Sequence, residues 1–358
     1  MPNMKHRGFV YKLICCVLVA AMALPLSACG ETKQTQREVF AMDTVMTLTA
    51  YGKKADAGLN AAESIILSMD AALDPELSTS TVYAINHAQG AGTVISGQIA
   101  KMLSTAHTVY EQSEGALDLT LYPVVKRWGF VDGKYYVPTA EEIAEDLARL
   151  CFDQLSLTSF PSSGSYSVTI PSYGEMSFAS CAKGCAADNA VEAMRQAGVT
   201  SGIISLGGNV QTLGLKPDGT NWNVAVQDPN NTASYLGVVS VGETAVVTSG
   251  GYQRFFTDAR GTKYQHIINP ASGYPVSNNL QSVTIICPDG TMADCLSTAM
   301  FVLGQSRAIS YWRNYGGFEM ILVTNNDNSS GKNQIICTKG LIEEFTLTNE
   351  NYELSFVE

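Results

Sequence analysis

Positive charge is scarce in this sequence beyond its first residues. The chain of 358 residues carries 22 Lys and Arg against 33 Asp and Glu, which gives a formal net charge of −11. No run of Lys and Arg occurs after the extreme N-terminus. A protein that binds nucleic acid as its main partner needs a basic patch. The sequence therefore predicts no nucleic-acid partner.

Two common site patterns are also missing. The nine Cys include no C-x-x-C pair, and only two of the four His lie beyond residue 100, so a zinc site is not expected. The Gly-rich turn ISLGGN (204–209) lacks the G-x-G-x-x-G that opens a helix in dinucleotide-binding folds. A tight turn in which glycine supplies positive φ explains this stretch better than a dinucleotide site does.

An apolar segment near the N-terminus is short for a membrane-spanning helix, which needs about 20 apolar residues. Lys5, Arg7 and Lys12 precede LICCVLVAAMALPLSA, the arrangement of a secretory signal peptide. The following LSAC (26–29) resembles a bacterial lipobox, in which the chain is cut before the Cys and the thiol carries diacylglycerol. An uncleaved anchor and an ordinary signal peptide are the alternatives.

This interpretation divides the chain into three parts. Residues 1–28 form the signal peptide, 29–38 a lipid-anchored polar tether, and 39–358 the folded domain. We expect the mature protein at the extracytoplasmic side of the cell membrane, held there through lipidated Cys29. Six Cys then remain, and an exported protein can pair them or keep them as buried thiols.

The composition is that of a folded protein, with 46% apolar and 15% charged residues. Strands and helices are interspersed without strict alternation, so the predicted fold class is α+β. Helices are expected over 54–72, 97–114, 139–150 and 183–197, and also over 292–300. Strands are expected over 44–51, 165–170, 201–206, 221–227, 244–248, 263–268 and 282–287.

The helical stretch MADCLSTAM (292–300) has an unusual polar stripe. Asp294, Ser297 and Thr298 lie at i, i+3 and i+4 and share one face of a helix. Mg²⁺ prefers such oxygen ligands. The stripe therefore suggests a metal site, with an N-terminal capping device or a solvated edge as the alternatives.

Two further residues stand out by their position. Lys183 in SFASCAKGCAAD (177–188) lies at the start of a predicted helix, where the helix dipole disfavours a cation. It is either a solvated first-turn residue or a group that meets an anion such as phosphate. His266 opens HIINPASGYP (266–275) near the end of an apolar strand. It is either a structural residue or a general base.

Seven motifs taken in order are more specific than any one of them. They are AMDT, GALDLT, SFASCAKGCAAD, LGGN, TSGGYQR, HIINPASGYP and ADCLSTAMFVLG. This series, from about Val39 to Gly304, resembles the ApbE family, the FAD:protein FMN transferases. The resemblance implies a single large domain, related to the T-fold, with a mixed or antiparallel sheet and helices.

The resemblance also implies an activity and its partners. Members transfer FMN from FAD to a Thr or Ser hydroxyl of an acceptor protein, which forms a phosphoester bond and releases AMP. The acceptors are subunits of membrane redox complexes or exported reductases. Mg²⁺ is the implied cofactor, because transfer at a diphosphate requires charge neutralisation.

The family motifs assign roles to individual residues. His266 matches the base that deprotonates the acceptor hydroxyl. The metal ligands are Ser180, through its carbonyl, and Asp294, Ser297 and Thr298. The FAD contacts are Met42, Glu76, Ala116, Leu117, Asp118, Ser177, Lys183 and Ile268.

The chain departs from the family pattern at four positions. Relatives usually have Gly at Asp43, an acid at Ser177, Asp at Asn209 and Asp at Asn269. The metal face and His266 are kept. Two other functions remain open: Mg²⁺-dependent hydrolysis of FAD to FMN and AMP, and a lipoprotein that binds flavin without chemistry.

Overall fold

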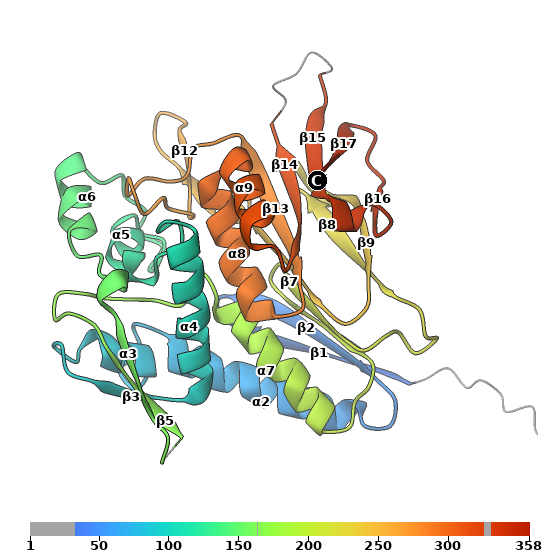
Figure 1. Cartoon of the computed structure of the whole chain (residues 1–358), viewed down its shortest axis with the longest axis horizontal. Helices are drawn as coiled ribbons and strands as arrows, with labels where there is room; N and C mark the ends of the chain where they lie inside the picture. Colours follow the sequence, from blue (N-terminus) through green and yellow to red (C-terminus); the bar gives the residue numbers. More distant parts are fainter. Residues whose placement is uncertain (1–32, 163, 326–330) are drawn as a thin grey trace, which may run out of the picture. The chain divides into compact units, whose positions relative to one another are not determined.

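A nine-stranded sheet runs through the folded unit Gln34–Glu358 (Figure 1). The computed structural model describes residues 33–162, 164–325 and 331–358, so the predicted signal peptide and Cys29 lie outside the described residues. Neighbouring strands are antiparallel, except for the last pair, which is parallel. In spatial order they are β1 (Gln34–Ala41), β2 (Thr44–Tyr51), β6 (Gly202–Leu206), β7 (Asn209–Leu213), β10 (Ala245–Gly250), β13 (Leu280–Cys287), β14 (Glu319–Thr324), β15 (Asn333–Thr338) and β17 (Tyr352–Val357).

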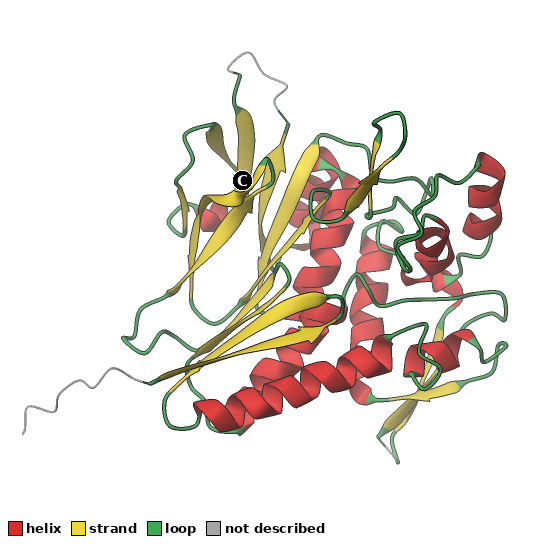
Figure 2. Cartoon of the chain, turned by 180° about the vertical axis from the view of Figure 1, so that it is seen from behind, coloured by secondary structure: helices red, strands yellow, loops and turns green. Residues whose placement is uncertain are grey.

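Helices cover one face of this sheet, and a small sheet covers the other (Figure 2). Because both faces are covered, the central strand β13 is buried along most of its length. The helices are α2 (Ala55–Leu73), α4 (Gly97–Gln112), α7 (Ala182–Gln196), α8 (Gly290–Leu303) and α9 (Gln305–Tyr315). The small sheet comprises β8 (Trp222–Asp228), β9 (Asn231–Val241) and β16 (Phe345–Leu347).

Shorter elements surround the helical layer. A satellite apolar cluster around Trp128 and Phe130 includes Ile268, so the HIINP turn packs on this region. Trp128 Nε1 donates a hydrogen bond of 2.8 Å to the carbonyl of Gly273 in the same turn. The short elements are α3 (Thr81–Asn86), β3 (Thr93–Ile95), η1 (Leu119–Leu121), α5 (Tyr122–Arg127), α6 (Ala140–Leu147), η2 (Phe152–Gln154), β4 (Ser156–Phe160), β5 (Ser165–Thr169), β11 (Phe255–Thr257), β12 (Lys263–Gln265) and η3 (Lys339–Leu341).

The α+β prediction with a mixed sheet is confirmed, but two segments differ from expectation. The tether predicted over 29–38 is wrong from Gln34 onwards, because those residues form β1. The first five residues of β1 are all polar, and exposed positions alternate with half-buried ones, which suits an edge strand that pairs only with β2 among the described strands. The strand predicted over 263–268 ends at Gln265, since the chain bends there to pair Ile268 with Pro275.

The described part of the chain shows the state of the cysteines and whether any of its helices could cross a membrane. The six cysteines left after the predicted signal, namely Cys151, Cys181, Cys185, Cys287, Cys295 and Cys337, are free and buried. Among the helices of the described residues, none combines the length and the apolar character that crossing a membrane requires.

A strained turn joins β1 to β2. Met42 and Asp43 both have positive φ, 48° and 58°, as in a two-residue type I′ hairpin, which favours Gly at its second position. We expect Asp43→Gly to stabilise the protein by about 0.5 kcal/mol, because about 1 kcal/mol of strain is relieved and roughly 0.5 kcal/mol is lost to glycine entropy. Urea unfolding measures this.

The matched control for that variant is Val45→Gly. Val45 is also exposed, but it lies inside β2 opposite Phe40, where glycine lowers strand stability. A loss of stability in both glycine variants would contradict the assignment of strain to Asp43.

Candidate active site

Helices α7 and α8 each cap the N-terminus of the other. The Asp294 carboxylate on α8 accepts a hydrogen bond of 2.8 Å from the amide of Gly184 in the first turn of α7. The Asp188 carboxylate on α7 accepts 2.8 Å hydrogen bonds from the amides of Gly290 and Thr291 at the start of α8. Carboxylates are stabilised at helix N-termini. This reciprocal capping fixes Asp294 at the N-terminus of α7.

Glycine is required where the two helices meet. A Cβ atom on Gly184 would lie 2.1 Å from the Gly290 carbonyl oxygen and 2.7 Å from Asp294 Cβ. Such contacts are too short for any side chain, so the glycine of the CAKGC motif allows the helix backbones to approach. This approach brings Lys183, which precedes Gly184, close to Asp294.

Asp294 is a buried carboxylate, only 4% exposed. Burial raises its pKa, whereas the charge of Lys183 and the Gly184 amide lower it. Asn209, the first residue of β7, also lowers this pKa. The Asn209 Nδ2 atom is buried and, among the described residues, finds no hydrogen bond of normal geometry.

Three hydroxyls lie beside this carboxylate. Ser297 is fully buried, and its Oγ donates 2.9 Å to the Asp294 carbonyl. Ser249 Oγ, from β10, lies 2.8 Å from Ser297 Oγ and 3.5 Å from Thr298 Oγ1. Ser249 was not among the predicted ligands, although it lies in the TSGGYQR motif. Ser297 donates to the main-chain carbonyl of Asp294 and also lies within hydrogen-bond distance of Ser249, so the half-buried Thr298 is the more available hydroxyl of α8, with Ser249 next to it.

Ser180 lies just before α7, where its carbonyl can serve as a ligand. In a helix extended towards the N-terminus, the Gly184 amide would bond to the Ser180 carbonyl. That amide donates to Asp294 instead. The Gly184 amide therefore does not occupy the Ser180 carbonyl, whose role as a metal ligand stays a prediction.

These oxygens fit Mg²⁺ better than a transition metal. Within the described ranges, no three His, Cys, Asp or Glu side chains gather as a metal-binding group. A cation here would be held by the Asp294 carboxylate, the Thr298 and Ser249 hydroxyls and the Ser180 carbonyl. One carboxylate with neutral oxygens suits a hard cation that also binds substrate phosphate. A bound cation would also offset the burial of the Asp294 charge.

His266 is oriented by a main-chain carbonyl. Its Nδ1 lies 3.0 Å from the Arg254 carbonyl oxygen, and its backbone amide donates to the same oxygen at 3.1 Å. Because a carbonyl only accepts, Nδ1 carries the proton and Nε2 keeps a lone pair. Burial lowers the pKa of His266 to about 4, and the charges of Lys183 and Arg254 contribute. The imidazole is therefore neutral at pH 7 and available as a base.

The two predicted FAD segments lie side by side. The Ser177 amide donates 3.0 Å to the Leu119 carbonyl, which joins SFAS to GALDLT. Asp118 caps η1 by accepting from the Thr120 amide at 2.7 Å, and burial raises its pKa. Ala116 and Leu117 are buried beside it.

The remaining predicted FAD contacts are more scattered. The Met42 amide donates 2.8 Å to Asp70, which holds the β1–β2 turn in place. Glu76 accepts from Tyr122 and, at 2.6 Å, from Lys126, both on α5. Ile268 buries its side chain in the Trp128 cluster, so it would meet a nucleotide through its main chain.

The structure thus brings together one part of the predicted site more tightly than the rest. The positive charge of Lys183 lowers the pKa of both Asp294 and His266, so the predicted anion-binding lysine is near the predicted metal ligand and near the predicted base. Glu76 instead bonds to Tyr122 and Lys126 of α5. Its role as an FAD contact stays a prediction.

A neutral histidine, a lysine and a face of oxygen atoms that could hold a metal ion suit an enzyme that acts on a phosphate ester or diphosphate. Residues 42–322 match the model of the ApbE family, and the chain belongs to that family. It is 30% identical over 315 residues to the FAD:protein FMN transferase of Haemophilus influenzae, covering 83% of this chain and 89% of that relative. The same identity over 317 residues relates it to the FAD:protein FMN transferase of Treponema pallidum, covering 83% and 87%.

Solved structures agree with this assignment. The ApbE protein of Thermotoga maritima superimposes with a TM-score of 0.75 at 26% identity, covering 82% of this chain and 94% of that one. The apo flavinyl transferase ApbE of Pseudomonas stutzeri gives a TM-score of 0.71 at 28% identity, covering 82% and 92%. The family and the ApbE-like fold predicted from the seven motifs are confirmed.

Proposed function

We propose that this chain is an Mg²⁺-dependent FAD:protein FMN transferase that forms a phosphoester with a Thr or Ser hydroxyl of an acceptor protein. The observation that carries the proposal is a pair of oriented groups: the buried Asp294 carboxylate is held at the start of α7 next to Lys183, and the His266 Nδ1 faces the Arg254 carbonyl so that Nε2 keeps a lone pair. The names of the relatives support the reaction. A protein that only binds flavin needs no neutral base beside its phosphate-binding lysine.

Each residue has a distinct task in this reaction. Bound Mg²⁺ supplies neutralisation of the diphosphate charge, and Asp294, Thr298, Ser249 and Ser180 would hold it. The Lys183 ammonium meets the phosphate at the N-terminus of α7. The His266 Nε2 takes the proton of the acceptor hydroxyl as the oxygen attacks phosphorus. The bond between the FMN phosphorus and the oxygen that bridges the two phosphates breaks, and AMP leaves with that oxygen.

The location of the reaction follows from the N-terminal motif. Our proposal includes cleavage before Cys29 and lipidation of its thiol, which would hold the enzyme at the extracytoplasmic face of the membrane. Acceptors on that face, such as subunits of membrane redox complexes or exported reductases, would then be within reach. The polar residues between Cys29 and β1 would serve as a short spacer.

The test uses the soluble chain starting at Gly30, FAD, Mg²⁺ and Thr-bearing acceptor domains of exported redox proteins. Flavin fluorescence on the acceptor band of a denaturing gel, lost on addition of EDTA, is the expected result. AMP and free FMN without a fluorescent band would indicate hydrolysis instead. Intact bound FAD with no AMP would indicate a flavin-binding protein.

A further inference from the structure

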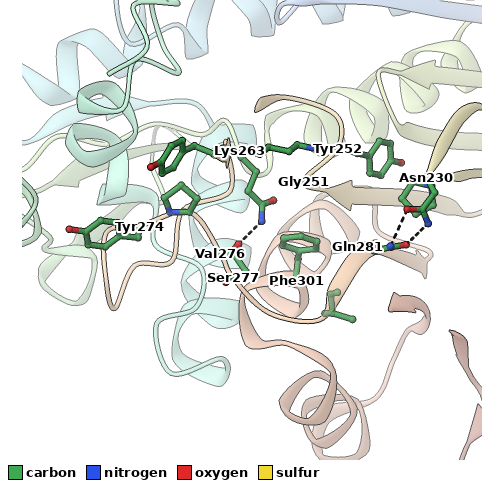
Figure 3. Close-up of a pocket in the computed structure, with 14 residues that line it drawn as sticks. Asn230, Gly251, Tyr252, Lys263, Tyr274, Val276, Ser277, Gln281 and Phe301 are labelled. Carbon is green, nitrogen blue, oxygen red and sulfur yellow. Dashed lines mark hydrogen bonds between the residues drawn. The ribbon is translucent and has the colours of Figure 1, made fainter. Parts of the chain in front are cut away.

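A cavity of about 430 Å³ is lined by residues outside the predicted FAD-binding set (Figure 3). Three of the residues that line it belong to segments that also carry the proposed base or the proposed metal ligands. Gln265 directly precedes His266, Gly251 follows Ser249 by two residues, and Phe301 lies one helical turn beyond Thr298. The chain therefore leads directly from the lining of the cavity to His266, to Ser249 and to the polar stripe of α8.

One wall of the cavity is an unpaired strand edge. Among the strands of the described residues, β12 pairs with β11 alone, in a two-stranded sheet. The His266 amide points towards β11, since it donates to the Arg254 carbonyl opposite. Main-chain groups alternate along an antiparallel strand, so the amides of Gln265 and Lys263 point away from β11.

The chain opposite this edge turns away before it can pair with β12. The Val276 amide donates 2.9 Å to the Ile267 carbonyl, which is the next group on the same edge. Beyond this point the two segments separate, and only the Gln265 side chain reaches across, donating 2.6 Å to the Val276 carbonyl. The cavity thus opens where one more extended strand could pair with β12.

The remaining walls are suited to a neutral or acidic polypeptide. Asn230 and Gln281 bond to each other through both amide groups, at 2.8 and 3.2 Å, and form a fixed polar end. Figure 3 places Tyr274 at the opposite end. Among the described residues that line the cavity, Lys263 brings a positive charge and no Asp or Glu is present, although the chain as a whole is acidic.

We infer that the acceptor protein binds here by strand addition, as an extended neutral or acidic segment that pairs with the outer edge of β12. This mode combines main-chain hydrogen bonds with side-chain pockets. It delivers the acceptor hydroxyl to His266, the residue that follows the paired edge. The inference rests on the proposed transferase function, because it assigns the second substrate of that reaction.

The decisive variant is Lys263→Pro. Proline removes the outward amide of β12 and leaves the hydrogen bonds to β11, since it is tolerated at the free edge of a strand. We expect KM for the acceptor to rise about tenfold, the value of one lost hydrogen bond. The dissociation constant of FAD should stay within twofold. The probe is the Thr-bearing domain that the wild-type chain flavinylates.

Two controls separate the edge from other effects. Thr257→Pro places proline on the outer edge of β11, opposite Lys263 and away from the cavity, and should leave KM unchanged. Lys263→Ala removes the charge but keeps the amide, so it should raise KM less than Lys263→Pro does. If Lys263→Pro, Thr257→Pro and Lys263→Ala unfold at similar temperatures, the two-stranded sheet of β11 and β12 is intact in all three.

A second variant tests the cavity without altering the strand. Ser277 is exposed at the cavity wall, so Ser277→Trp should fill the space and raise KM for the acceptor. The exposed Ala271 lies in the neighbouring turn and outside the lining, and Ala271→Trp is its control. Wild-type KM in both Lys263→Pro and Ser277→Trp would overturn the inference while the transferase stands. Absence of transfer by the wild type would instead refute the proposed function.

Discussion

Asp294→Asn is expected to lower kcat for Mg²⁺-dependent FMN transfer by about 10²–10³-fold, because stabilisation of the transferring phosphate by a metal ion is worth several kcal/mol. The fold should survive. The asparagine oxygen can still accept the Gly184 amide hydrogen bond, and the cost of burying a charge disappears. Without Mg²⁺ the variant should therefore melt at or above the wild-type temperature. Transfer rates and melting curves, each with and without Mg²⁺, measure both effects.

Asp188→Asn is the matched control, since it changes the partner carboxylate in the same helix exchange. Asp188 accepts four hydrogen bonds, which come from Gly290, Thr291 and Gln211. An amide nitrogen there would face one of these donors and destabilise the protein by about 1–3 kcal/mol. The Mg²⁺ response should persist. Equal loss of the Mg²⁺ response in both variants would contradict the assignment of Asp294 as a metal ligand.

Local patterns predicted most of the elements that carry the site. The i, i+3, i+4 spacing placed Asp294, Ser297 and Thr298 on one helix, and α8 spans them. Periodicity alone could not separate them. Ser297 is fully buried and donates to the helix backbone, whereas Thr298 is half-buried, and both lie near Ser249 of a strand that is 48 and 49 positions away in the sequence.

Contacts between distant segments were beyond the reach of the sequence. The pairing of Asp188 with α8 and of Asp294 with α7 depends on glycine contacts between two helices more than 90 residues apart. The polar edge strand β1 read as a tether because its exposed face resembles a linker. The missed helix contacts and the wrong assignment of β1 have the same cause: tertiary packing decides which residues are buried, and a local sequence pattern does not contain that information.

His266→Ala should lower transfer by about 10²–10⁴-fold, the usual contribution of a general base, while FAD still binds. His266→Asn is the sharper variant. Its side-chain amide can donate to the Arg254 carbonyl in place of Nδ1, but it has no basic nitrogen. A loss as large as that in the alanine variant would mean that proton transfer matters, and not the hydrogen bond. Near-normal turnover of His266→Asn would make His266 a structural residue.

The pH dependence of transfer gives an independent measure of the same role. Burial and neighbouring cations disfavour the imidazolium, so the pKa of His266 falls to about 4, below the ordinary 6.5 of histidine. The neutral base is then present above that value and is lost as the pH falls through it. We expect kcat/KM to stay level from about pH 8 to 5 and to decline below about pH 4.5, in line with that pKa. An acid limb centred near pH 6.5 would show that His266 is exposed to solvent in the working enzyme and that Lys183 does not act on it. The variant His107→Asn, at a half-buried histidine that packs on Phe152, should keep the wild-type profile.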